Sequence, residues 1–170
     1  PAADRRGQIG MMRQTLKQLL GANATGLWLT ERVWEPELPS TLAASGIAYT
    51  MLDTKHFETS RPFVPPGLQV DDEFWDLLGC YTTEHAGHPV QVFPMSKRLR
   101  YWIPFQEPER TVEFLRRAAR TEPVAVTYAD DGEKFGLWPK TYAWVYEQGW
   151  LERFFTALEG EASWLRTETF

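Results

Sequence analysis

Apolar residues recur every three to four positions in the first twenty residues of the chain. With Arg13 and Lys17 between them, these positions predict an amphipathic helix over residues 4–20. Gly21 and Asn23 are residues that commonly end a helix, so we expect this one to end there. The apolar positions are Ile9, Met12, Leu16, Leu19 and Leu20.

Three short apolar runs predict buried strands, and each run leads into acidic residues. Runs of this kind are typical of parallel strands covered on both faces. Glu31 ends the first run, Asp53 ends the second, and Asp130 and Asp131 follow the third. The runs cover residues 26–31, 47–53 and 123–129.

Helices are predicted between and after these strands. Residues 36–45 form a short helix that Gly46 ends. Residues 108–121 form a longer one, because proline suits a first turn and the arginines near its end suit the last turn. The segments 141–148 and 150–158 are helical, with a break near Gly149.

Two stretches are harder to assign from the pattern. Three prolines make regular structure unexpected in residues 55–67. Residues 80–83 and 90–93 flank a turn at Gly87, and they form either a hairpin or, for the second, a barrel strand that ends at Pro94.

Strands that alternate with helices indicate the α/β class, with a parallel sheet covered by helices. The 170 residues are enough for one domain with its own core, and they contain no internal repeat, low-complexity tract or linker. We therefore expect a single domain over residues 1–170.

Composition narrows the function classes. The net charge of −5 argues against nucleic acid as a partner, and no apolar run is long enough to span a membrane. Cys80 is the one cysteine, which rules out an internal disulfide and fits a reducing compartment. No catalytic base is visible near it in the sequence, so its side chain is expected to be packed against other residues. No signal peptide is visible, so a cytoplasmic protein is predicted, and the start at Pro1 suggests an excised piece.

Tryptophan is unusually frequent, with eight residues in the chain. Flat aromatic rings stack on the apolar faces of sugar rings, so carbohydrate binding is one interpretation. Core packing is the other, because aromatic side chains supply much of the buried area in any globular protein. Composition alone favours core packing.

The acids after separate strands invite three interpretations. In parallel α/β folds the carboxyl ends of the strands meet on one face, where active sites lie. The acids there could serve as acid/base and nucleophile on a glycosidic bond, or bind magnesium or calcium. Helix capping is the third possibility and is favoured for any single acid, whereas the whole set favours a site.

Two motifs carry most of the candidate chemistry. In Trp-Leu-Thr-Glu-Arg-Val-Trp-Glu-Pro, residues 28–36, Arg32 could hold Glu31 or a neighbouring acid in its charged form. In Asp-Asp-Gly-Glu-Lys-Phe-Gly-Leu-Trp-Pro, residues 130–139, three acids within four residues repel one another, which favours a protonated carboxyl that can act as a general acid. Lys134 would neutralise part of this charge.

These two motifs closely resemble the third and fourth sequence regions of glycoside hydrolase family 57, and look most like its 4-α-glucanotransferase and α-amylase members. The resemblance implies a retaining enzyme in which Glu31 is the nucleophile and Asp131 the general acid/base. It further implies that Glu133 is an active-site acid and that Trp28 and Trp138 contact substrate.

The resemblance also implies a fold. The family's catalytic domain is a seven-stranded distorted (β/α) barrel, and the family's first, second and fifth regions have no match in this sequence. Residues 1–170 would thus be a partial catalytic domain with about four parallel strands of the barrel. Its uncovered sheet edges would favour self-association.

Other candidates complete the expected site. His56 and Asp130 are expected to bind substrate alongside the residues above. His85 and His88 lack a third ligand nearby, so no metal is expected, and the chemistry needs no organic cofactor. The predicted partner is an α-glucan or maltooligosaccharide. The alternative is a carbohydrate-binding fragment without catalytic activity.

Overall fold

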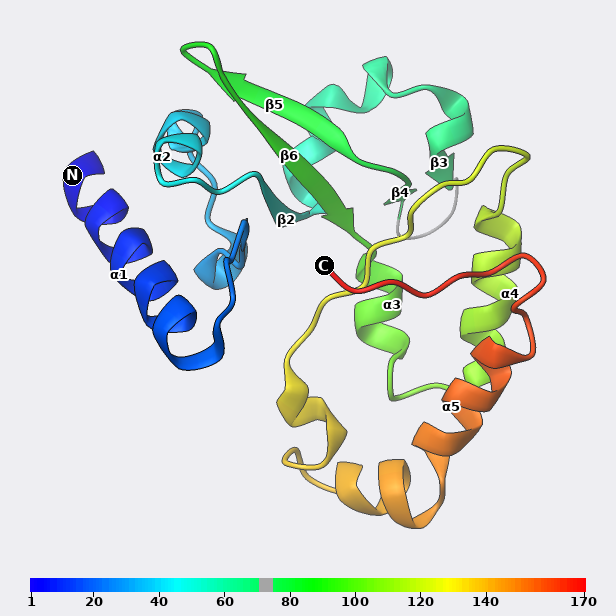
Figure 1. The fold of residues 1–170 in the computed structure, drawn as a ribbon. Helices are drawn as coiled ribbons and strands as arrows, with labels where there is room; N and C mark the ends of the chain where they lie inside the picture. The colour runs from blue at the N-terminus through cyan, green and yellow to red at the C-terminus, as the bar shows by residue number, and fades with distance from the viewer. Residues whose placement is uncertain (71–74) are drawn as a thin grey trace. The chain divides into compact units, whose positions relative to one another are not determined.

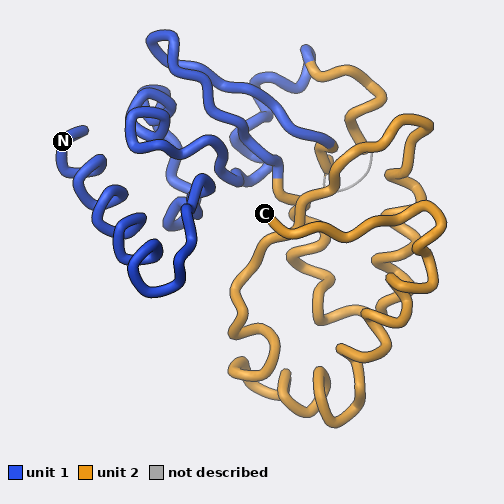
Figure 2. Tube along the Cα trace, in the orientation of Figure 1, with its two compact units in different colours: residues 1–63, 79–94 blue, residues 64–78, 95–170 orange. Residues whose placement is uncertain are grey.

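The computed structural model describes residues 1–70 and 75–170 (Figure 1). These residues form two compact units, which consist of residues 1–63 with 79–94 and of residues 64–78 with 95–170 (Figure 2). The motif around Glu31 lies in the first unit and the motif around Asp131 in the second.

The first unit carries a long helix, a short helix and most of a four-stranded sheet. The sheet has the order β1-β2-β6-β5, with β1 parallel to β2 and β5 antiparallel to β6. The elements are α1 (Ala2–Leu20), β1 (Gly26–Leu27), α2 (Leu38–Ala44), β2 (Tyr49–Asp53), β5 (Tyr81–His85) and β6 (His88–Met95), with 3₁₀ helices at Thr30–Arg32 and Thr54–Phe63.

The second unit is mainly helical. Its strands β3 (Gln69–Val70) and β4 (Asp76–Leu77) pair antiparallel, and Met95 and Thr127 form an isolated parallel bridge. Its helices are α3 (Lys97–Trp102), α4 (Pro108–Ala118) and α5 (Trp150–Glu159), with 3₁₀ helices at Pro66–Leu68 and Gly132–Phe135 and a π-helix at Ala143–Glu147.

Each unit has its own apolar core. In the first unit Leu42, Ile47 and Val90 are almost fully buried, and the half-buried Ile9 of α1 packs against them. In the second unit Phe114 of α4 and Trp150 of α5 are fully buried in a larger cluster. This core thus holds α4 and α5, the two helices between which residues 119–149 run.

The predicted helices are confirmed, with their ends close to the expected residues. Gly21 ends α1 in the left-handed conformation, with φ of 67°, and Pro108 occupies the first turn of α4. Gly149 has φ of 68° and separates the π-helix from α5. The choice left open for residues 80–93 is settled as a hairpin, with its turn at Ala86 and Gly87.

Three local predictions are wrong. The strand expected over residues 26–31 stops at Leu27, because the backbone turns at Glu31 and Arg32 into positive φ. The strand expected over residues 123–129 is reduced to the bridge at Thr127. The Pro-rich stretch forms 3₁₀ helices, since proline fixes φ at a value that this helix accepts.

Candidate active site

Glu31 lies in a turn with an uncommon backbone conformation. Glu31 has φ of 51° and ψ of 14°, and Arg32 has φ of 52°. Non-glycine residues rarely adopt this left-handed region, and each costs about 1–3 kcal/mol unless its surroundings hold it there. Such residues cluster at active sites, because the conformation aims a side chain where a strand or helix would not. The Glu31 side chain is exposed.

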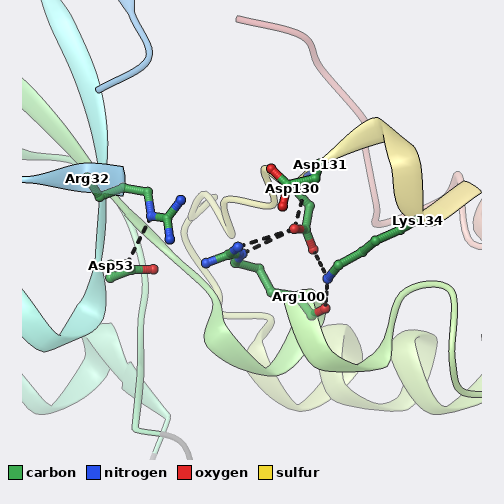
Figure 3. A network of polar contacts seen from close by, with 6 residues as sticks. All are labelled: Arg32, Asp53, Arg100, Asp130, Asp131 and Lys134. Atoms are coloured by element: carbon green, nitrogen blue, oxygen red, sulfur yellow. Dashed lines mark hydrogen bonds and ion pairs between the residues drawn. The ribbon is translucent and has the colours of Figure 1, made fainter. Parts of the chain in front are cut away.

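Arg32 holds this turn against strand β2. Its Nε lies 3.1 Å from Oδ2 of Asp53, the last residue of the strand (Figure 3). Its guanidinium lies 5.7 Å from the centre of the Trp28 ring, within the range of a cation–π interaction. The partner of Arg32 is therefore the neighbouring acid Asp53, one of the two possibilities that the sequence left open.

A hollow of about 340 Å³ lies beside the Glu31 turn within the first unit. Trp28 and Thr30 line it. Arg5 of α1 and Glu35 also line it and form an ion pair, with Nη2 of Arg5 2.6 Å from Oε2 of Glu35. The Trp28 side chain is 42% exposed. Most of the other lining residues are apolar, among them Leu27, Leu29 and Val33, so the hollow offers one aromatic ring beside a largely apolar surface.

His56 lies in the 3₁₀ helix Thr54–Phe63, three residues after the end of β2, and is exposed. Its neighbour Phe57 is buried and packs against the ring of Tyr81, with centroids 5.7 Å apart. This contact fixes the backbone that carries His56. The role of His56 toward substrate stays a prediction.

In the second unit, the side chain of Asp130 is only 1% exposed and is held by two cations (Figure 3). Oδ1 accepts hydrogen bonds from Nη2 and Nε of Arg100, at 3.3 and 3.4 Å, and Oδ2 accepts one from Nζ of Lys134. Lys134 also donates to the carbonyl oxygen of Arg100 at 2.5 Å. We call Arg100, Asp130 and Lys134 the Asp130 cluster.

Asp131 follows this buried residue and is itself exposed. Its N–H donates to Oδ1 of Asp130 at 2.9 Å, and its carbonyl oxygen accepts the N–H of Lys134 at 3.3 Å. Glu133 is also exposed, in the 3₁₀ helix that begins after Asp131. The Glu133 carbonyl accepts the N–H groups of Leu137 and Trp138, at 2.9 and 3.1 Å.

Trp138 presents a half-exposed ring on the loop that follows. It stacks on Phe105 with ring centroids 6.0 Å apart and planes 20° apart, and it remains 41% exposed. Nζ of Lys134 lies 5.6 Å from the centre of each of these rings. The ring is thus fixed from one side while part of its surface stays available for stacking.

Tyr128 adds a neutral group to this region. Burial raises the pKa of Tyr128 well above its ordinary value; the negative charge of Asp130 raises it further, and Arg100 opposes this. Its surroundings therefore favour the neutral phenol more strongly than water does.

The described residues contain no group of three or more His, Cys, Asp or Glu side chains placed to hold a metal ion. His85 and His88 face each other across the β5–β6 turn, and Nδ1 of His85 lies 3.1 Å from the Ser40 hydroxyl. Among residues 1–70 and 75–170, no helix has the length and apolarity needed to cross a bilayer.

A comparison with protein families decides the class. The sequence model of glycosyl hydrolase family 57 matches residues 1–169. The chain belongs to glycosyl hydrolase family 57. Members of the family are similar along almost its whole length: it is 44% identical over 159 residues to a 4-alpha-glucanotransferase of Thermococcus litoralis. It is 43% identical over 162 residues to an alpha-amylase of Pyrococcus abyssi.

These matches cover 93–95% of this chain but only 22–23% of the two relatives, so the chain spans under a quarter of their length. A crystal structure of 4-alpha-glucanotransferase from Thermococcus litoralis matches with a TM-score of 0.79 and 42% identity, over 93% of this chain and 23% of that one. The family 57 chain is thus an α/β structure with parallel strand pairing and helices, similar to that enzyme.

The predicted site residues of this family 57 chain fall into two groups, one in each unit. Glu31, Trp28 and His56 belong to the first unit; Asp130, Asp131, Glu133 and Trp138 belong to the second. The structure brings the members of the second group together around one short loop. The substrate role of every one of these residues stays a prediction.

Arg100 is the main residue that sequence reasoning did not assign to the site. Arg98 pairs with Asp76, and Arg100 pairs with Asp130. The pairing of Arg100 with Asp130 joins residues 30 positions apart, which no local spacing reveals. Lys134, in contrast, stands four residues after Asp130 and was expected to neutralise acids there.

Proposed function

We propose that this chain is the central part of the catalytic domain of a retaining enzyme that acts on α-1,4-glucans, as a 4-α-glucanotransferase or an α-amylase. Residues 1–170 would form one partial catalytic domain with about four strands of a seven-stranded barrel. The observation that carries the proposal is the match at over 40% identity, along 93–95% of the chain, to relatives with these two names.

In this proposal Glu31 is the nucleophile. A carboxylate oxygen of Glu31 attacks the anomeric carbon, the glycosidic bond breaks, and a glycosyl-enzyme ester forms. The exposed position of Glu31 and its positive φ support this role, since the side chain projects from a turn that Arg32 ties to β2. Trp28, half exposed beside it, would stack on a glucose ring.

Asp131 is the general acid and then the general base. It donates a proton to the leaving glycosidic oxygen, which departs as a free hydroxyl. It then removes a proton from water or from an acceptor sugar hydroxyl, whose oxygen attacks the same carbon and releases Glu31. Two inversions give net retention, and a retaining pair works with its carboxyl groups about 5–5.5 Å apart.

Supporting residues would bind the glucan around this pair. Trp138 offers a fixed and half-exposed ring, and the exposed Glu133 and His56 offer hydrogen bonds to sugar hydroxyls. Asp130 was expected to contact substrate as well, but its carboxylate is buried and already bound on both oxygens. We therefore assign Asp130 a part in holding the loop.

The test of this function uses a family-length enzyme that carries this chain. Substitution Asp131→Asn should lower kcat/KM on maltoheptaose by about 100- to 10,000-fold, the usual contribution of general acid catalysis. A 4-nitrophenyl α-maltoside has a leaving group that needs little protonation, so its kcat/KM should fall much less. NMR of the first product should show retained α-configuration. Equal losses on both substrates, or an inverted product, would contradict the proposal.

The second candidate is a carbohydrate-binding piece without turnover. It is favoured by one observation, which is that the chain spans under a quarter of the relatives' length. The two candidates differ in the family-length enzyme: new chain lengths formed from maltoheptaose, and lost in Glu31→Gln, indicate catalysis, whereas binding of maltoheptaose by that enzyme without new products indicates the second candidate.

A further inference from the structure

We propose that the Asp130 cluster, Arg100, Asp130 and Lys134, is a positioning device that sets the place of the Asp131 carboxyl group and of the Trp138 ring. This inference rests on the proposed role of Asp131 as acid/base. It assigns no direct contact with substrate to any of the three residues, which act through the loop that they hold.

The cluster is unusual because its charged groups are buried. Asp130 is 1% exposed and Lys134 is 7% exposed, and Arg100 is mostly buried beside them. Burying three charges costs several kcal/mol per ion, and apolar residues of similar volume would serve stability as well or better. Stability alone therefore does not explain the cluster, whereas a need for one defined local geometry does.

The cluster also holds the backbone of Asp131. Both backbone polar groups of Asp131 are bound by members of the cluster: its N–H by Oδ1 of Asp130, its carbonyl oxygen by the N–H of Lys134. Arg100 belongs to α3, so the cluster ties the loop of Asp131 to a helix whose residue Leu99 is buried in the core. A general acid must lie within hydrogen-bond reach of one oxygen atom, and small displacements remove that reach.

The cluster also borders the stacked rings of Phe105 and Trp138. Nζ of Lys134 lies 5.6 Å from both Phe105 and Trp138. The carbonyl of Glu133, the residue before Lys134, accepts the N–H of Trp138. The same lysine that neutralises Asp130 therefore also fixes the stacked ring pair, so the cluster couples the place of the acid to the place of a sugar-stacking surface.

The chain offers a matched control in the same unit. Arg98 and Asp76 form another buried ion pair, with Nε and Oδ2 3.1 Å apart, and Arg98 packs over the rings of Trp102 and Phe114. These contacts of Arg98 lie at Asp76, Trp102 and Phe114 and not in the loop of Asp131. Its removal should affect the fold alone.

The experiment measures kcat/KM, which reports the glycosylation step, on maltoheptaose and on 4-nitrophenyl α-maltoside in the family-length enzyme. Variants Lys134→Met and Arg100→Met should lose about 10- to 100-fold on maltoheptaose and several-fold less on the activated substrate, because a misplaced acid matters less for a good leaving group. Arg100→Lys, which keeps the charge, should recover part of the loss. Arg98→Met should lower the thermal midpoint without changing the ratio of the two kcat/KM values.

The outcomes separate the two proposals. Equal losses of kcat/KM on both substrates in Lys134→Met and Arg100→Met, or no loss, overturn the positioning role. Asp131 remains the acid in that case if Asp131→Asn still loses more on maltoheptaose than on the activated substrate. If Asp131→Asn itself fails to discriminate, the proposed function is wrong at that residue. Should one methionine variant not fold, the other decides by the same comparison of the two substrates.

Discussion

Nε of Arg32 lies 3.1 Å from Oδ2 of Asp53, and this contact joins the turn of Glu31 to the end of strand β2. Two successive residues at positive φ would relax if nothing held them, because each is strained by about 1–3 kcal/mol. The contact is partly exposed, so its value for global stability is small. Its value for the direction of the Glu31 side chain is expected to be larger.

Substitution of Asp53 should therefore affect activity more than stability. In a family-length enzyme, Asp53→Asn should lower kcat on maltoheptaose by about 10-fold, because the Arg32 anchor weakens and Glu31 is misaligned. Its free energy of unfolding should change by at most ~1 kcal/mol. Glu107→Gln, which removes the carboxylate of the exposed pair with Arg153, is the control and should change neither quantity. A normal kcat in Asp53→Asn would show that the contact does not align Glu31.

The role of Glu31 itself is tested by Glu31→Gln. The amide is a poor nucleophile of almost the same shape, so turnover should fall to background while binding of maltoheptaose stays within about 3-fold of the parent. Calorimetry measures the binding and chromatography of products measures the turnover. Substantial remaining turnover would mean that another carboxylate attacks the sugar.

Sequence reasoning located the elements of this chain well where local chemistry defines them. Helix ends at Gly21 and Gly149 were predictable, because a glycine after an apolar periodic run is a local signal for the left-handed conformation. The two site motifs were proposed from residue type and order, and the substrate roles of their residues stay predictions. Lys134 was expected to neutralise part of the acidic charge, and it pairs with Asp130, four residues before it.

The features that were missed depend on distant partners. An apolar run predicts burial, but a strand also needs a neighbour's backbone, and of residues 123–129 only Thr127 has such a partner in the described structure. The turn at Glu31 was not predictable because glutamate carries no preference for positive φ. Arg32 pairs with Asp53, which is 21 positions away, and Arg100 pairs with Asp130, which is 30 positions away.

Gly136 should be the least replaceable glycine of the Asp131 loop. Its φ is 141°, and a Cβ there would lie 3.2 Å from Cε2 of Tyr146. Gly136→Ala should lower the free energy of unfolding by about 1–3 kcal/mol. Gly132→Ala is the control, since a Cβ at that position meets nothing within 4 Å and should leave stability almost unchanged. Urea denaturation measures both, and equal effects would argue against strain at Gly136.

Cys80 was expected to be packed, and this is wrong: the residue is exposed next to strand β5. Partial burial of its sulfur nevertheless raises the pKa of the Cys80 thiol, against the lowering effect of backbone hydrogen bonds at Val92 and Tyr81. A raised pKa means less thiolate at pH 8, so alkylation by iodoacetamide should be slower than for an unfolded chain. The midpoint of the rate against pH should lie above that of the urea-unfolded chain. The urea-unfolded chain is the control, and an equal or lower midpoint in the folded chain would contradict the expected shift.

The isolated chain should self-associate or be only marginally stable, and it should show no measurable glucanotransferase or amylase activity. Strands β1 and β5 are the edges of the four-stranded sheet, and no residue of α1 is buried, while its Leu19 and Leu20 are 76% and 73% exposed. Unpaired sheet edges and uncovered apolar side chains seek partners, and burial lost there lowers the free energy of unfolding.

Light scattering on the purified chain measures its mass, and a disproportionation assay with maltooligosaccharides measures its activity. If Leu19 and Leu20 drive the association, a Leu19→Gln and Leu20→Gln double variant should be less associated than the parent, whereas the exposed Phe155→Gln control should not be. A stable monomer that disproportionates maltooligosaccharides would refute both parts, and it would mean that Glu31, Asp131 and their neighbours suffice for catalysis without any further part of a barrel.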